Sequence, residues 1–143
     1  MVFNMIKDSR TCYYLSVRQK VENDGFKTFQ GADGSLPYIS FGSSKFHIEL
    51  RKNVRNIPFE IRLDFESGDK AENLRRARQT QESFLKKKIP LPPGETLSET
   101  WTRLICHTDE TLGYVPDADK TAELIRNAWN GIPVDVLRWA GLA

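Results

Sequence analysis

Two stretches of the chain alternate between apolar and polar side chains. In residues 45–52, Phe46, Ile48 and Leu50 occupy one set of alternate positions, and the other set is charged or polar. Residues 57–65 repeat the pattern, with an apolar side chain at every second position. Because successive side chains of a β-strand point to opposite faces, both stretches are predicted to be strands that bury one face and expose an ionic face.

The four residues between these strands, 53–56, predict a β-hairpin. This loop length places Glu49 opposite Glu60 on the ionic face. It also places His47 opposite Arg62. A slip of one residue would turn every apolar side chain to solvent, so we expect the alternation to fix the pairing.

Helices are predicted on both sides of the hairpin in the chain. Apolar residues three and four apart indicate them, capping residues mark their starts, and glycine or proline marks their ends. The expected elements, in chain order, are a helix over 9–23 closed by Gly25, strands over 38–41, 45–52 and 57–65, a helix capped by Asp69 that runs to about Lys88, a strand over 99–107, a helix capped by Asp117 or Asp119 that ends before Gly131, and a short helix begun by Pro133.

This order predicts a single α+β domain over residues 1–143. Its sheet is expected to be mostly antiparallel, a three-stranded meander plus a later strand, with the helices packed on one face. Trp101, Trp129 and Trp139 are expected to fill the core. The alternative use for each tryptophan is to anchor a partner protein.

Charge is unevenly distributed along the chain, although the net charge is only +2. Residues 70–88 hold seven basic and two acidic side chains, whereas residues 95–123 hold seven acidic and two basic ones. The two segments would neutralise each other if they touch, and would give a bipolar surface if they lie apart. The sequence leaves both arrangements open.

Several segments carry a resemblance to a known family. They are the predicted strands FHIEL (46–50) and FEIRLDF (59–65), the helix entry SGDKAEN (67–73), the helix tail QESFLKK (81–87) and the stretch WTRL (101–104). On these segments, residues 38–104 resemble a bacterial family of domains of unknown function that often trails a predicted restriction-type nuclease domain. In that family a nuclease half usually precedes the domain, whereas this chain reaches its first predicted helix within a few residues. The resemblance implies a setting of DNA processing or defence against mobile elements, and it carries over no catalytic residue.

The ionic face of the hairpin is a candidate for catalysis. Neighbouring carboxylates raise each other's pKa, which favours a general acid or a metal ligand. Glu49, Glu60 and Asp64 would form the centre of a metal-dependent hydrolase. Arg51 and Arg62 lie diagonal to the first two and would neutralise them. We therefore favour a protein without enzymatic activity, and expect no catalytic residue and no bound metal.

The sequence indicates no cofactor, because it contains no glycine-rich phosphate-binding loop. Cys12 and Cys106 each stand without a second nearby cysteine, so both are expected to be reduced thiols packed in the interior. No apolar stretch reaches the roughly 18 residues of a membrane helix, and the N-terminus lacks a secretory signal. We therefore expect a cytoplasmic protein that contacts no membrane.

The basic segment 70–88 favours contact with nucleic acid, because lysine and arginine neutralise phosphates. The leading hypothesis is a non-enzymatic binding module that acts on a nucleic-acid-processing or defence-related assembly, with nucleic acid or a protein complex of that assembly as partner. The candidate contact residues are Arg51, Arg55, Arg62, Arg75, Arg76, Arg78, Lys86, Lys87 and Lys88.

A small inhibitor or accessory protein of a bacterial defence or counter-defence system is the second hypothesis. The acidic segment 95–123 would then imitate nucleic acid or meet a basic partner. The pairs Arg78–Glu82 and Glu82–Lys86 are each four residues apart, which is typical of an ordinary solvated helix. The sequence leaves open which of the two charged segments is the binding surface, and in which oligomeric state the protein acts.

Overall fold

The computed structural model describes residues 13, 15–30, 38–51, 60–91, 96–108 and 117–143. A helical segment covers residues 15–23, and Gly25 follows it with a φ of +94°. The other elements are β1 (Phe29–Gln30), β2 (Tyr38–Gly42), β3 (Phe46–Arg51), β4 (Glu60–Phe65), α2 (Lys70–Lys86), β5 (Leu97–Ser98), β6 (Arg103–Thr108), α4 (Ala118–Gly131) and α5 (Val134–Trp139). The α+β class is confirmed.

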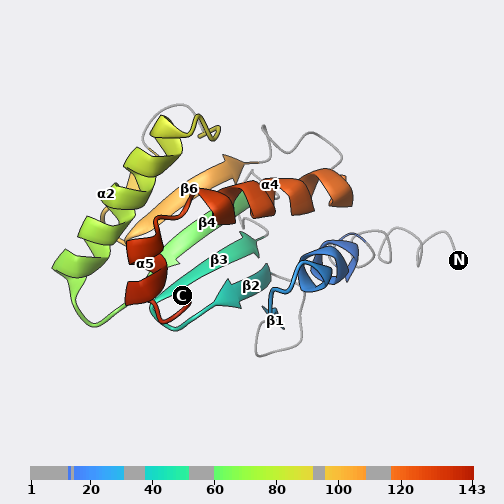
Figure 1. Ribbon diagram of the computed structural model, residues 1–143, viewed down its shortest axis with the longest axis horizontal. Helices are drawn as coiled ribbons and strands as arrows, with labels where there is room; N and C mark the ends of the chain where they lie inside the picture. Colours follow the sequence, from blue (N-terminus) through green and yellow to red (C-terminus); the bar gives the residue numbers. More distant parts are fainter. Residues whose placement is uncertain (1–12, 14, 31–37, 52–59, 92–95, 109–116) are drawn as a thin grey trace, which may run out of the picture.

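The strands form one six-stranded sheet in the order β1-β2-β3-β4-β6-β5, and every neighbouring pair is antiparallel. The predicted meander is β2-β3-β4, and the predicted later strand is β6, which lies beside β4. Figure 1 shows α4 and α5 in front of the sheet, with α2 along one side of it. The edge strands β1 and β5 were not predicted, because two residues are too few to show an alternation.

The apolar face of the hairpin forms the centre of the core, as the alternation predicts. Phe46, Ile48 and Leu50 of β3 are fully buried, and so are Ile61 and Leu63 of β4. Burial of side chains of this size stabilises a fold by roughly 1.5–3 kcal/mol each. The pairing of these two strands therefore fixes the centre of the molecule.

The register of this hairpin differs by two residues from the predicted one. Glu49 lies opposite Arg62 rather than Glu60, and His47 lies opposite Asp64. A shift of two residues keeps every side chain on its own face, so the alternation cannot distinguish the two registers. The predicted strand residues 57–59 and the loop 53–56 lie outside the described residues.

The helix starts follow the capping signals. The Asp69 carboxylate accepts a hydrogen bond from the Glu72 amide at 3.1 Å and begins α2. The Asp117 carboxylate accepts from the amides of Asp119 and Lys120 and begins α4. This helix includes Gly131 instead of ending before it.

Strand β6 begins at Arg103, four residues later than predicted. Residues 99–102 form a turn, in which Thr102 has a φ of +48°. Trp101 is consequently 68% exposed, so its predicted place in the core is wrong. Trp129 and Trp139 are partly buried against the core, and the Trp129 ring contacts Phe26 at a centroid distance of 5.1 Å.

No helix within the described ranges has both the length and the apolar character needed to cross a membrane. Cys106 is a free, fully buried thiol, as expected, and Cys12 lies outside the described residues.

Candidate functional site

The ionic face of the hairpin is buried, which contradicts the predicted exposure to solvent. Arg62 is 5% exposed and Asp64 is 1% exposed. Glu49 and Glu60 are also buried. Arg62 is therefore not a surface residue, in contrast to its predicted place among the contact residues. Together with His47 and Arg103 these side chains form what we call the ionic cluster.

His47 lies between two carboxylates in this cluster. Its Nε2 atom is 3.1 Å from Glu49 Oε1 and 3.4 Å from Asp64 Oδ2. Burial lowers the pKa of the imidazole, but the hydrogen bonds and negative charges of these two carboxylates outweigh burial and raise it to about 10. His47 is therefore a cation at neutral pH.

Two arginines neutralise the rest of the cluster. The Arg62 guanidinium lies 3.0 Å from Glu49, 3.4 Å from Glu60 and 3.5 Å from Asp64. Arg103 donates a hydrogen bond to Asp64 at 2.9 Å. Burial raises the pKa of Asp64, but its hydrogen bonds with His47 and Arg103 outweigh burial and hold that pKa below its usual value.

The cluster thus contains three cations and three carboxylates. Buried charges are tolerated when they are paired in this way.

A metal ion could find ligands in the same place. His47, Glu49 and Asp64 each offer a ligand atom within 4.8 Å of the others, two of the three residues being buried. Two carboxylates and an imidazole are an acceptable donor set for a divalent metal. However, a metal would have to displace the His47 proton and compete with the Arg62 guanidinium. The charges present therefore favour a self-neutralised cluster over a metal centre.

Most basic residues of α2 are exposed, whereas Arg76 is partly buried, and several of them have acidic partners. The Glu72 carboxylate forms ion pairs with Arg75 at 2.7 Å and with Arg76 at 2.8 Å. Arg78 pairs with Glu99 at 2.6 Å rather than with Glu82, the predicted partner four residues away. The basic and acidic segments of the chain therefore touch at this one described ion pair between them. Arg75 and Arg78 remain 64% and 57% exposed.

The C-terminal end of α2 carries three further lysines. Lys86, Lys87 and Lys88 are all exposed, and Lys87 Nζ donates to the carbonyl of Asn130 at 3.0 Å. Arg51 ends β3, and nothing further is described of its side chain; Arg55 lies outside the described residues. The structure therefore brings six of the predicted contact residues together on one helix and its end, and buries Arg62 elsewhere.

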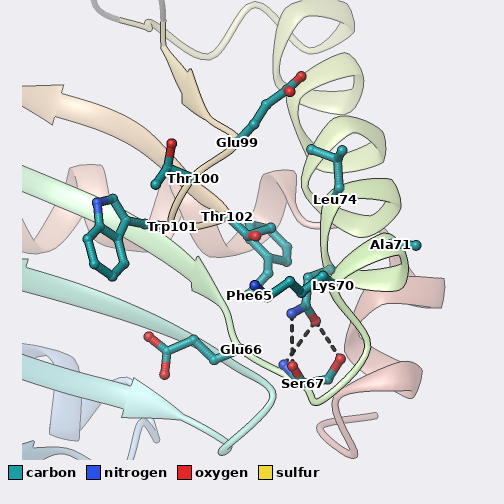
Figure 2. Close-up of a pocket in the computed structure, with 11 residues that line it drawn as sticks. Phe65, Glu66, Ser67, Lys70, Ala71, Leu74, Glu99, Thr100, Trp101 and Thr102 are labelled. Atoms are coloured by element: carbon teal, nitrogen blue, oxygen red, sulfur yellow. Dashed lines mark hydrogen bonds between the residues drawn. The ribbon is translucent and has the colours of Figure 1, made fainter.

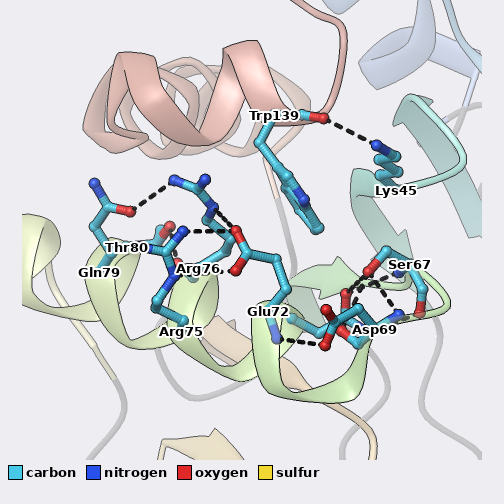
Figure 3. Close-up of polar contacts among 10 residues, drawn as sticks. Lys45, Ser67, Asp69, Glu72, Arg75, Arg76, Gln79, Thr80 and Trp139 are labelled. Carbon is cyan, nitrogen blue, oxygen red and sulfur yellow. Dashed lines mark hydrogen bonds and ion pairs between the residues drawn. The ribbon is translucent and has the colours of Figure 1, made fainter.

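A hollow of about 630 Å³ lies along this helix. It is lined by Ala71, Leu74, Arg75, Arg76, Arg78, Gln79, Glu82 and Asp135. Figure 3 shows the guanidinium groups of Arg75 and Arg76 gathered around Glu72. Arg76 also lies 5.8 Å from the centre of the Trp139 ring, and this cation–π contact links α2 to α5.

A second hollow, of about 590 Å³, lies on the other side of Ala71 and Leu74. Its lining includes Phe65, Glu66, Ser67, Lys70, Asn73, Glu99, Thr100, Trp101 and Thr102. Figure 2 shows Trp101 across this hollow from the α2 side chains. This hollow was not predicted, because residues 99–107 were expected to form a strand and Trp101 to fill the core, with partner binding only as the alternative.

Comparison of the chain with protein-family models, with curated proteins and with solved structures finds no match. The resemblance to the nuclease-associated family therefore stays a prediction.

Proposed function

We propose that the protein is a non-enzymatic binding module that contacts nucleic acid through the basic side of α2, as part of a nucleic-acid-processing or defence-related assembly. The observation that carries this proposal is the convergence of Arg75, Arg76 and Arg78 on one hollow of about 630 Å³. Guanidinium groups bind phosphate oxygens with two parallel hydrogen bonds, so a concave arginine surface suits a phosphodiester backbone.

The charges of α2 support this reading. The helix carries five basic and two acidic side chains, and Lys87 and Lys88 extend the positive charge beyond its end. A phosphate would compete with Glu72 for Arg75, whose side chain is exposed and whose ion pair is therefore weak, whereas the Arg76 pair is partly buried. The Glu72 carboxylate thus holds these guanidinium groups in place, and a phosphate can take its position.

A fluorescent DNA duplex of about two helical turns would test the proposal. Affinity should fall steeply between low and moderate salt, because each protein–phosphate contact releases a counterion. Arg75→Glu should weaken binding about tenfold or more at low salt, since it removes one phosphate contact and introduces repulsion. Lys120→Glu, an equal charge change at an exposed position of α4, is the matched control and should change affinity little.

Equal losses in the two variants would show that only net charge matters, and no loss in either would reject α2 as the contact surface.

A partner protein is the second candidate. Trp101 lies in the acidic segment 95–123 and is mostly exposed, and exposed aromatic residues are common anchors in protein interfaces. The hydrolase is the third candidate, and the cations of the ionic cluster weigh against it.

A further inference from the structure

Trp101 lines one side of the second hollow, on a turn whose backbone is tied to the neighbouring strand. Trp101 is 68% exposed, although large aromatic side chains normally bury most of their surface. The next residue, Thr102, has a φ of +48°, which is uncommon for a residue that is not glycine. The Thr102 carbonyl accepts a hydrogen bond from the Phe65 amide at 3.1 Å, which ties the turn to the end of β4.

The floor and the facing wall of this hollow are also fixed. Asn73 is buried, and its side-chain amide exchanges two hydrogen bonds of 2.9 Å with the backbone of Ser67. The Glu66 amide donates to the Lys45 carbonyl at 2.7 Å. The backbone around the hollow is therefore fixed before any ligand arrives, which lowers the entropic cost of binding.

The charged residues that line the hollow are two acidic and one basic. Glu66 and Glu99 both line it, and Lys70 is its one basic lining residue. Glu99 already forms an ion pair with Arg78, whereas Glu66 is exposed and has no ion pair among the described residues. Figure 2 shows the Glu66 carboxylate on the Trp101 side of the hollow, with Lys70 on the α2 side. A phosphate would meet an unneutralised carboxylate here, whereas a cation would meet both a carboxylate and an indole ring.

We propose that this hollow binds a cationic side chain, an arginine or a lysine, of a partner protein. The cation lies against the face of Trp101 and pairs with Glu66, while its methylene groups cover Leu74 on the opposite wall. Cation–π attraction is strongest at tryptophan, and a carboxylate at the same point adds a charge-assisted hydrogen bond. This inference goes beyond nucleic-acid contact by α2 and does not depend on it.

The test uses the ¹⁵N-labelled full chain and the peptide Gly-Ser-Arg-Ser-Gly, with blocked ends, followed by NMR. The Trp101 indole N–H resonance, assigned by its loss in Trp101→Phe, should shift and saturate as the peptide is added. The same peptide with citrulline, which keeps the shape and lacks the charge, should bind about tenfold more weakly. A peptide with lysine should bind in the same place.

Two variants locate the site. Glu66→Gln should weaken binding of the arginine peptide several-fold, and Glu123→Gln, at an exposed position of α4, should leave it unchanged. Arg75→Glu should keep peptide binding even where it removes DNA binding, so the two proposals can fail separately. Equal binding of the arginine and citrulline peptides, no shift of the Trp101 resonance, or a shift of that resonance by a short DNA strand in place of the peptide would overturn the proposal.

Discussion

At the scale of single residues, the stability of the protein against pH depends on His47. Its pKa is raised from 6.5 to about 10 by Glu49 and Asp64, so the folded protein binds the His47 proton more tightly than the unfolded chain does. This contribution to stability is complete below pH 6.5 and is lost as the pH rises through about 10.

We therefore expect the free energy of unfolding to fall between pH 6.5 and 10 by on the order of 2 kcal/mol, a figure reduced for the partial exposure of His47. Urea denaturation at a series of pH values measures this change. His47→Gln should be less stable at pH 6.5 and should show a much flatter profile over the same range. An equally steep profile in that variant would assign the pH dependence to other groups.

The same residue governs whether the ionic cluster accepts a metal. At pH 7 His47 carries a proton and Arg62 occupies the carboxylates, so magnesium, manganese or zinc should leave the melting temperature unchanged. Thermal denaturation with and without each metal makes the measurement. A rise in melting temperature that Glu49→Gln abolishes and Glu123→Gln preserves would instead favour the metal-dependent hydrolase.

Sequence reasoning at this scale identified the ionic residues but not their environment. The alternation placed His47, Glu49, Arg62 and Asp64 on one face of the hairpin, and they do share a face. The pattern contains no information about a two-residue shift in register, which replaces a predicted carboxylate pair by an ion pair between Glu49 and Arg62. Nor does it reveal that this face is buried, because burial depends on segments distant in the chain.

At the scale of elements, helices α2 and α4 approach each other so closely that only glycine fits at their contact. A Cβ atom at Gly131 would collide with a methyl carbon of Ile89 and would lie 2.6 Å from the Phe84 ring. Phe84 is fully buried and cannot move aside without disturbing the core. Ser83 Oγ donates to the Gly131 carbonyl at 2.7 Å and holds the helices at this distance.

Gly131→Ala should therefore destabilise the protein by about 1–3 kcal/mol, although alanine is the better helix former. Chemical denaturation gives the value. Gly68→Ala is the matched control, since a Cβ atom there has no neighbour within 4 Å and its stability should stay within about 1 kcal/mol of wild type. A stabilised Gly131→Ala protein would show that the helix contact is looser than described.

Helix starts were predictable because they depend on local chemistry, as the caps at Asp69 and Asp117 show. The start of β6 was not, because the turn over residues 99–102 is held by a distant partner, the Phe65 amide. The error had consequences for function, since it favoured the core over the alternative of partner binding for Trp101.

At the scale of the whole molecule, α2 separates two hollows of different charge. Three arginines face the hollow near α5, whereas Glu66 and Trp101 face the hollow near the 99–102 turn. The sequence left open whether the basic and acidic segments touch or lie apart. In the described part of the chain they meet at the ion pair between Arg78 and Glu99.

The outermost strands of the sheet, β1 and β5, are two residues long each. An edge strand with unpaired amides and carbonyls can template the addition of a strand from another molecule, and its length sets how many hydrogen bonds such an addition gains. The terminal strands β1 and β5 offer very few such hydrogen bonds. Within the described residues, the edges of the sheet are therefore poorly suited to add a strand from another molecule.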